Sequence, residues 1–200
     1  MCAFIIHRPQ KNTVLELHMT KVNLKQYIQF SVVNKAQFPC NLKLEVTLDN
    51  EIFNSPGIFF LFYRGELIYI GFTNNNQNVI GERVIRQIAT ITMRDYRLQF
   101  TNAALDALIN DPVFDSYFNV PKPIVANTDF VTSVNRVNFA SSHWDEFKNF
   151  NNETLSRFEM EWYPNPKVIG CISIEEISQQ LIEYYKPRCN KEYCKPILNY

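Results

Sequence analysis

The stretch that decides the fold is Gly57-Ile58-Phe59-Phe60-Leu61-Phe62-Tyr63-Arg64-Gly65-Glu66-Leu67-Ile68-Tyr69-Ile70-Gly71-Phe72-Thr73. Two runs of apolar and aromatic residues flank the dipeptide Arg64-Gly65. A two-residue connection that ends in glycine is typical of a tight turn between antiparallel strands. The sequence therefore predicts a β-hairpin, with strands over residues 57–63 and 66–73.

Apolar periodicity predicts the elements on both sides of this hairpin. Helical spacing favours helices over residues 79–93 and 174–185, the last of which ends at Pro187. Further helices are expected over residues 23–36, with Asn23 as the cap, and over residues 102–110, before Asp111-Pro112. Alternation of Phe158, Met160 and Trp162 with charged residues predicts a half-buried strand. Further strands are expected over residues 13–20, 41–48 and 130–139, the last within an otherwise loop-rich stretch that extends to about residue 153.

Composition places the chain among ordinary globular proteins, because 46% of its 200 residues are hydrophobic and 20% are charged. The formal net charge is zero, so nucleic acid would have to bind a local basic patch. No apolar run reaches the roughly 18 residues that a membrane span needs. The five cysteines lack paired C-x-x-C spacing, which favours reduced thiols over a zinc site. We expect a cytoplasmic protein that does not enter a membrane.

Four short motifs follow one another along the chain: Gly57-Ile58-Phe59, Tyr69-Ile70-Gly71, Glu82-Arg83-Val84 and Leu181-Ile182-Glu183-Tyr184-Tyr185-Lys186-Pro187-Arg188-Cys189-Asn190. The set resembles the GIY-YIG nucleases, over about residues 55–100 and 155–190. The resemblance implies an α+β fold in which helices flank a small antiparallel β-sheet. Residues 1–54 would then be an N-terminal extension that contacts DNA, and residues 55–200 a nuclease-like domain with an insertion at about 103–153.

The resemblance also implies roles for residues of the hairpin and of the helix that follows. Tyr69 would orient the attacking water or a phosphate oxygen. Arg83 would hold the phosphate, since a guanidinium binds it bidentately and keeps its charge, and Arg86 is the alternative one turn on. A solvent-facing strand tyrosine and solvated helix arginines are the plainer interpretations. The expected DNA contacts are Arg86, Lys186, Arg188, Asn190 and His143, and the expected basic surface is Arg83, Arg86, Arg94, Arg97, Lys186 and Arg188.

Two residues depart from the pattern that the resemblance implies. Ser178 stands where the metal-binding glutamate is expected, and a hydroxyl is a poor ligand for a hard divalent cation. Phe59 stands where a tyrosine is expected, and it has no hydroxyl to relay a proton. Helical spacing puts Ser178 on the apolar stripe, which suits a site-facing position, a replaced glutamate or close packing. Glu176 fits a capping box, so Glu175 is the better substitute metal ligand.

Three functions stay open on the sequence. The first is a sequence-specific DNA endonuclease or nickase that hydrolyses phosphodiester bonds of double-stranded DNA with one Mg²⁺ or Mn²⁺. The second is a GIY-YIG-like protein that kept DNA binding and lost catalysis. The third is an interaction protein whose hairpin matches the family by accident. A homodimer is compatible with all three.

Overall fold

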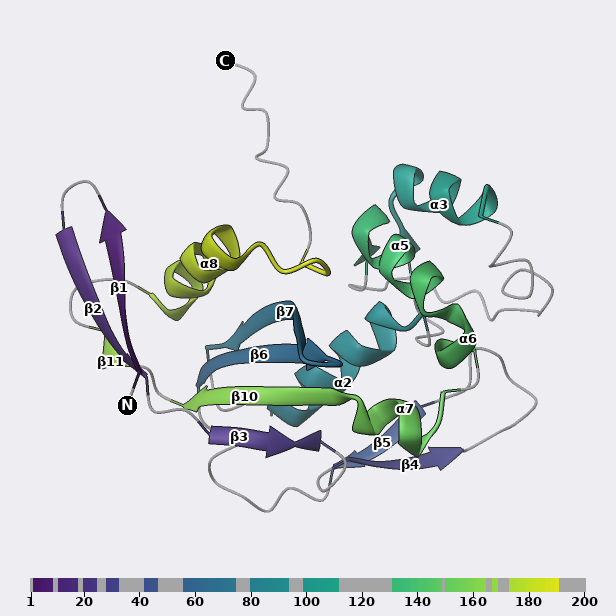
Figure 1. Cartoon of the computed structure of the whole chain (residues 1–200), viewed down its shortest axis with the longest axis horizontal. Coiled ribbons are helices and arrows are strands. Elements are labelled where there is room, and N and C mark those ends of the chain that lie inside the picture. The colour runs from purple at the N-terminus through teal and green to yellow at the C-terminus, as the bar shows by residue number, and fades with distance from the viewer. Residues whose placement is uncertain are drawn as a thin grey trace.

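The structure is a computed structural model, drawn in Figure 1. It describes residues 2–8, 11–17, 20–24, 28–32, 42–46, 56–74, 80–93, 99–111, 131–148, 150–164, 167–168 and 173–190. The predicted basic residues Arg94 and Arg97 lie outside this described part.

The predicted hairpin is confirmed and lies in a four-stranded antiparallel sheet. Its strands are β6 (Gly57–Tyr63) and β7 (Glu66–Thr73), and the strand order is β3 (Thr20–Asn23), β10 (Phe158–Pro164), β6, β7. Arg64 and Gly65 both have positive φ, 52° and 79°, which is the conformation that matches the twist of two paired strands. Together with the helices of the chain, this antiparallel sheet confirms the predicted α+β class.

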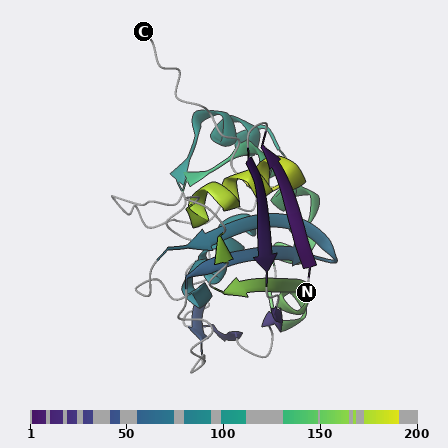
Figure 2. The same cartoon turned by 90° about the vertical axis from the view of Figure 1, so that its left-hand side faces the viewer.

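Each face of this sheet has its own hydrophobic core. On one face, Phe59, Leu61 and Tyr63 pack with Trp162 and with apolar residues of the helices α2 (Ile80–Ile91), α5 (Val134–Ser142), α6 (Trp144–Phe147) and α7 (Asn152–Ser156). On the other face, Ile58, Phe60 and Ile70 pack with Ile177 and Leu181 of α8 (Ile174–Tyr185). Figures 1 and 2 show α8 beside β7. The helices over 80–91 and 174–185 match their predictions, including the capping box of Ser173 and Glu176.

Three smaller sheets and one more helix complete the described part. The strands β1 (Cys2–Arg8), β2 (Lys11–Leu17) and β11 (Lys167–Val168) form an antiparallel sheet, which is seen from its flat side in Figure 2. The strands β4 (Ile28–Val32) and β5 (Leu42–Val46) pair antiparallel, and β8 (Gln99–Phe100) pairs with β9 (Val131–Thr132) in parallel. The predicted helix over 102–110 is α3 (Asn102–Ile109). No helix among the described residues is both long and apolar enough to span a bilayer.

Two secondary-structure predictions are wrong. The predicted helix over 23–36 gives way to β4, because apolar Ile28, Phe30 and Val32 alternate with polar residues at strand spacing. The predicted strand over 130–139 is a two-residue β9 followed by α5. There, Val134 and Val137 recur at helical spacing and pack into the core, and Ser133 occupies the N-cap position without a capping hydrogen bond from its side chain. The expected loop-rich stretch up to residue 153 therefore holds α5, α6 and the start of α7.

Candidate functional site

The outer edge of β7, the side away from β6, is closed by groups from elsewhere in the chain. The Cys189 N–H donates to the Ile68 carbonyl at 2.8 Å. The Asn190 side-chain amide donates to the Ile70 carbonyl at 2.8 Å and accepts from the Ile70 N–H at 2.9 Å. The Arg83 guanidinium donates to the Phe72 carbonyl. These groups take the backbone positions that a further strand would otherwise bond, which is how edge strands are protected from unwanted pairing.

The sequence after α8 explains how residues 189 and 190 reach this edge. Lys186 ends the helix in the left-handed conformation, with φ 49° and its N–H bonded to the Ile182 carbonyl at 2.8 Å. Pro187 has no N–H and cannot continue a helix. The chain therefore turns beside β7, where Asn190 is only 8% exposed. The predicted DNA contact Asn190 uses both ends of its amide on Ile70.

Tyr69 of β7 faces α5 and contacts Arg136 of that helix. The Arg136 guanidinium carbon lies over the Tyr69 ring, 5.3 Å from its centre. Its Nε donates to the Cys189 carbonyl at 2.8 Å, and its Nη2 donates to Gln87 Oε1 at 2.9 Å. Burial lowers the pKa of Arg136, while the Tyr69 hydroxyl and the Cys189 thiol favour its charged form. Arg136 thereby joins β7, α2, α5 and the segment after α8.

The aromatic surroundings of Tyr69 are tightly packed. The rings of Phe59 and Tyr69 lie 5.8 Å apart, centre to centre, on the same face of the sheet. A Cβ at Gly71 would come within 2.4 Å of the Phe59 ring and 2.8 Å of the Tyr69 ring. Gly71 is therefore required for the close approach of both rings to β7.

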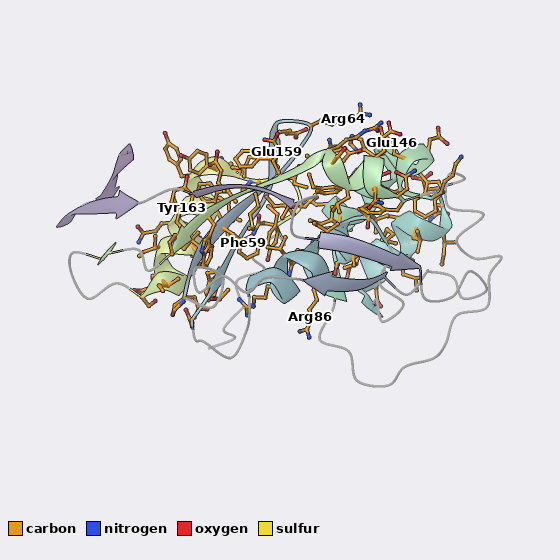
Figure 3. The ribbon with its side chains drawn as sticks, turned by 90° about the horizontal axis from the view of Figure 1, so that it is seen from below. Phe59, Arg64, Arg86, Glu146, Glu159 and Tyr163 are labelled. Carbon is orange, nitrogen blue, oxygen red and sulfur yellow. The ribbon has the colours of Figure 1, made fainter. Side chains whose placement is uncertain are left out.

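Arg83 and Arg86 come from the first turns of α2. The Arg83 guanidinium lies 5.6 Å from the Phe72 ring centre, in addition to its bond to the Phe72 carbonyl. Arg83 is thus placed on the backbone edge of β7, and the guanidinium that contacts Tyr69 is that of Arg136. Arg86 is exposed and projects outward from α2 in Figure 3.

The structure does not bring Ser178 to the face of the sheet on which Tyr69 lies. The apolar stripe of α8 packs on the opposite face, and Ser178 is 1% exposed, with an Oγ that has no hydrogen-bond partner. Glu175 is exposed in the first turn of the same helix. No group of three potential ligands from His, Cys, Asp and Glu occurs among the described residues. Among the described residues, the position that the resemblance assigns to the metal ligand therefore holds a buried hydroxyl and no carboxylate, which does not fit a divalent-metal site.

The remaining predicted DNA contacts lie in two places. His143 lies between α5 and α6, with its ring 4.5 Å from Phe139 and 5.1 Å from Tyr63, and its Nδ1 is 2.9 Å from the Phe139 carbonyl. It belongs to an aromatic cluster rather than to a loop. Lys186 and Arg188 are exposed in the segment after α8, and the Arg188 guanidinium lies 5.6 Å from the Phe139 ring centre.

The turn end of the hairpin carries a second polar cluster, which the sequence did not reveal. Tyr63 donates to Glu146 Oε2 at 2.5 Å, and Glu146 is also bound by Arg64, at 2.5 Å, and by Arg157. Burial and then the Glu146 carboxylate raise the pKa of Tyr63 to about 12. Burial would raise the pKa of Glu146, but the Tyr63 hydroxyl and the two guanidinium groups outweigh it and lower that pKa. Figure 3 shows Arg64 and Glu146 together at this end.

Sequence reasoning missed Arg136, although one signal for it exists. Arg136 lies within the predicted insertion and belongs to none of the four motifs. On a helix it stands three residues before Phe139 and four before Ala140, and both of these are buried. An arginine on the buried stripe of an amphipathic helix indicates an internal partner for its charge.

Comparisons with known proteins add no relative: no family model, no curated protein and no solved structure matches this chain. The GIY-YIG resemblance rests on the four short sequence motifs.

Proposed function

We propose that this protein binds double-stranded DNA along the outer edge of β7, on a GIY-YIG-like scaffold that has lost metal-dependent cleavage. The observation that carries the proposal is the charge around this edge. Arg83, Lys186 and Arg188 lie along it and the buried Arg136 lies behind it, and within the part of the chain that the structure describes none of them forms an ion pair with a carboxylate. Phosphate groups are the natural counter-ions of such a surface.

The order of the elements supports the scaffold. The hairpin β6–β7 is followed by α2, later by β10 next to β6, and finally by α8 packed against β7. This is the arrangement that the resemblance implies for a small antiparallel sheet flanked by helices. Tyr69 keeps a guanidinium partner.

The proposed loss of cleavage follows from Ser178 and Phe59, the two residues that depart from the pattern of the resemblance. Metal-assisted hydrolysis needs carboxylate ligands that hold the cation at the scissile phosphate. Ser178 is buried on α8 without a polar partner, and Phe59 adds no hydroxyl beside Tyr69. The endonuclease hypothesis is the alternative, and a cleavage assay decides between the two.

The test combines binding and cleavage on the same preparations. We expect the wild-type chain to bind a labelled duplex in fluorescence anisotropy, with affinity that falls as salt rises because phosphate contacts release counter-ions. We expect it to leave supercoiled plasmid uncut in Mg²⁺ or Mn²⁺. Nicked or linear plasmid would support the endonuclease instead. Absence of binding at low salt would contradict the proposal and favour a protein-interaction role.

A further inference from the structure

In the described part of the chain, Arg136 brings a positive charge into the core without a carboxylate partner. It is 4% exposed, and the acceptors of its Nε and Nη2 groups are the Cys189 carbonyl and the Gln87 amide, both neutral. Among the described residues no carboxylate pairs with it. Burying a charge is costly, and in the described part the Cys189 carbonyl, the Gln87 amide and the Tyr69 ring offset part of this cost.

The geometry directs this charge at Tyr69. The guanidinium carbon lies over the Tyr69 ring, 5.3 Å from its centre. Cys189 and Gln87 fix the guanidinium from two other directions. Tyr69 is partly buried, whereas Arg136 is 4% exposed, so a ligand from solvent would meet Tyr69 before Arg136. The charge behind the phenol is weakly screened, because buried charges are shielded from salt.

We propose that Arg136 is a positioning residue of a phosphate subsite at Tyr69: it holds the phenol in place and supplies the positive potential that attracts a phosphodiester oxygen. The inference rests on the proposed function and names the ligand chemistry of one point on the β7 edge. Arg83 is not part of this subsite, because its guanidinium donates to the Phe72 carbonyl and so stabilises the β7 edge. A full charge in low-dielectric surroundings acts over several ångströms, so direct contact between Arg136 and the phosphate is not required.

The test is fluorescence anisotropy with a labelled DNA duplex at several salt concentrations, on variants whose circular dichroism matches that of the wild type. We expect Arg136→Met to weaken binding about tenfold and to flatten the salt dependence, in line with the loss of about one phosphate interaction. Arg136→Lys keeps the charge and should recover most of this loss. Tyr69→Phe keeps the ring and should weaken binding about threefold to fivefold, the scale of one hydrogen bond. Arg64→Met removes one charge at the turn end and should change affinity less than about twofold.

The outcomes separate the two proposals. A wild-type chain that binds no DNA contradicts the proposed function. If the wild type binds and folded Arg136→Met binds equally well, the subsite alone is wrong. Equal losses in Arg136→Met and Arg136→Lys also overturn it, because they would show that packing, and not charge, is responsible. If Arg136→Met does not fold, Tyr69→Phe decides, and wild-type affinity in that variant refutes the subsite.

Discussion

Cations at the turn end of this hairpin and along its β7 edge have opposite surroundings. At the turn end, Arg64 and Arg157 share the Glu146 carboxylate, and Lys148 binds Asp145 at 2.6 Å. At the outer edge of β7, Arg83 and Arg136 bond neutral backbone carbonyls. Among the described residues, the carboxylates that pair with these cations lie at the turn end, and the cations at the β7 edge bond neutral groups instead.

The turn end and the β7 edge also differ in what holds their backbone in place. The turn is local and depends on the positive φ of Arg64 and Gly65. The β7 edge depends on the Asn190 amide, 120 residues away from its partner Ile70. A substitution at the edge therefore removes hydrogen bonds between distant segments of the chain. A substitution at the turn strains the backbone of only two residues.

The largest stability effect is expected for Asn190→Ala. The substitution leaves the buried Ile70 N–H and carbonyl without partners, and each unsatisfied group costs about 1–3 kcal/mol. We expect a loss of about 3 kcal/mol in urea denaturation. The control is Asn138→Ala on the exposed face of α5, where alanine also favours the helix. If Asn190→Ala lowers the free energy of unfolding by less than about 1 kcal/mol, groups other than the Asn190 amide stabilise the β7 edge.

Glycine substitutions give the next contrast. Gly71→Ala forces the Phe59 and Tyr69 rings to move, because a Cβ would lie 2.4 Å from the first of them, and overpacking of this kind costs about 1–3 kcal/mol. Gly65→Ala has open space and pays only the strain of φ 79°, about 1 kcal/mol. Thermal unfolding measures both. If Gly65→Ala is the more damaging variant, the close packing of β7 is not what stabilises this region.

Tyr63→Phe tests the turn end through pH. The variant should lose about 1.5 kcal/mol near neutral pH, because Tyr63 bonds a charged acceptor. Burial and Glu146 raise the pKa of Tyr63 from 10.0 to about 12, so the folded state favours the protonated phenol. This contribution is complete below pH 10 and disappears between about pH 10 and 12.

The stability difference between wild type and Tyr63→Phe, measured by urea denaturation at several pH values, should therefore shrink across that window. The lowered pKa of Glu146 acts in the opposite sense: its contribution is present above the ordinary carboxyl range and is lost as the pH falls through the lowered value. A difference that stays constant from pH 9 to 12 would contradict the assignment of the raised pKa to Tyr63.

The smallest effect is expected for Lys148→Gln. Its ion pair with Asp145 is exposed, and such pairs contribute about 0.2–1 kcal/mol at most. We expect a change below about 0.5 kcal/mol that vanishes in high salt. A larger, salt-independent loss would mean that the turn-end charges are coupled into one network.

Local chemistry decided which parts of this fold were predictable. The hairpin follows from β-formers around Arg64-Gly65, and α8 follows from its capping box and Pro187. α5 was missed because Val131, Val134 and Val137 are β-branched and suggest a strand, whereas the buried spacing of α5 is helical. Propensity gave way to packing there.

The site was less predictable than the fold. Tyr69 and Arg83 were placed near β7 by motif, but the partner of Tyr69 is Arg136, which comes from another part of the chain. The motif gave Asn190 a DNA contact, while its amide bonds Ile70. Contacts between residues more than 50 positions apart leave no spacing in the sequence, so only the folded chain reveals them.

The central claim is that the β7 edge, and not the turn end, binds DNA. The most direct measurement compares two double variants that each remove two positive charges: Lys186→Gln with Arg188→Gln at the edge, and Arg64→Gln with Lys148→Gln at the turn end. Anisotropy across a salt series should show the edge variant about tenfold weaker, with a salt slope smaller by about two, and the turn-end variant close to wild type. Equal losses in both variants, or a larger loss at the turn end, would contradict the claim.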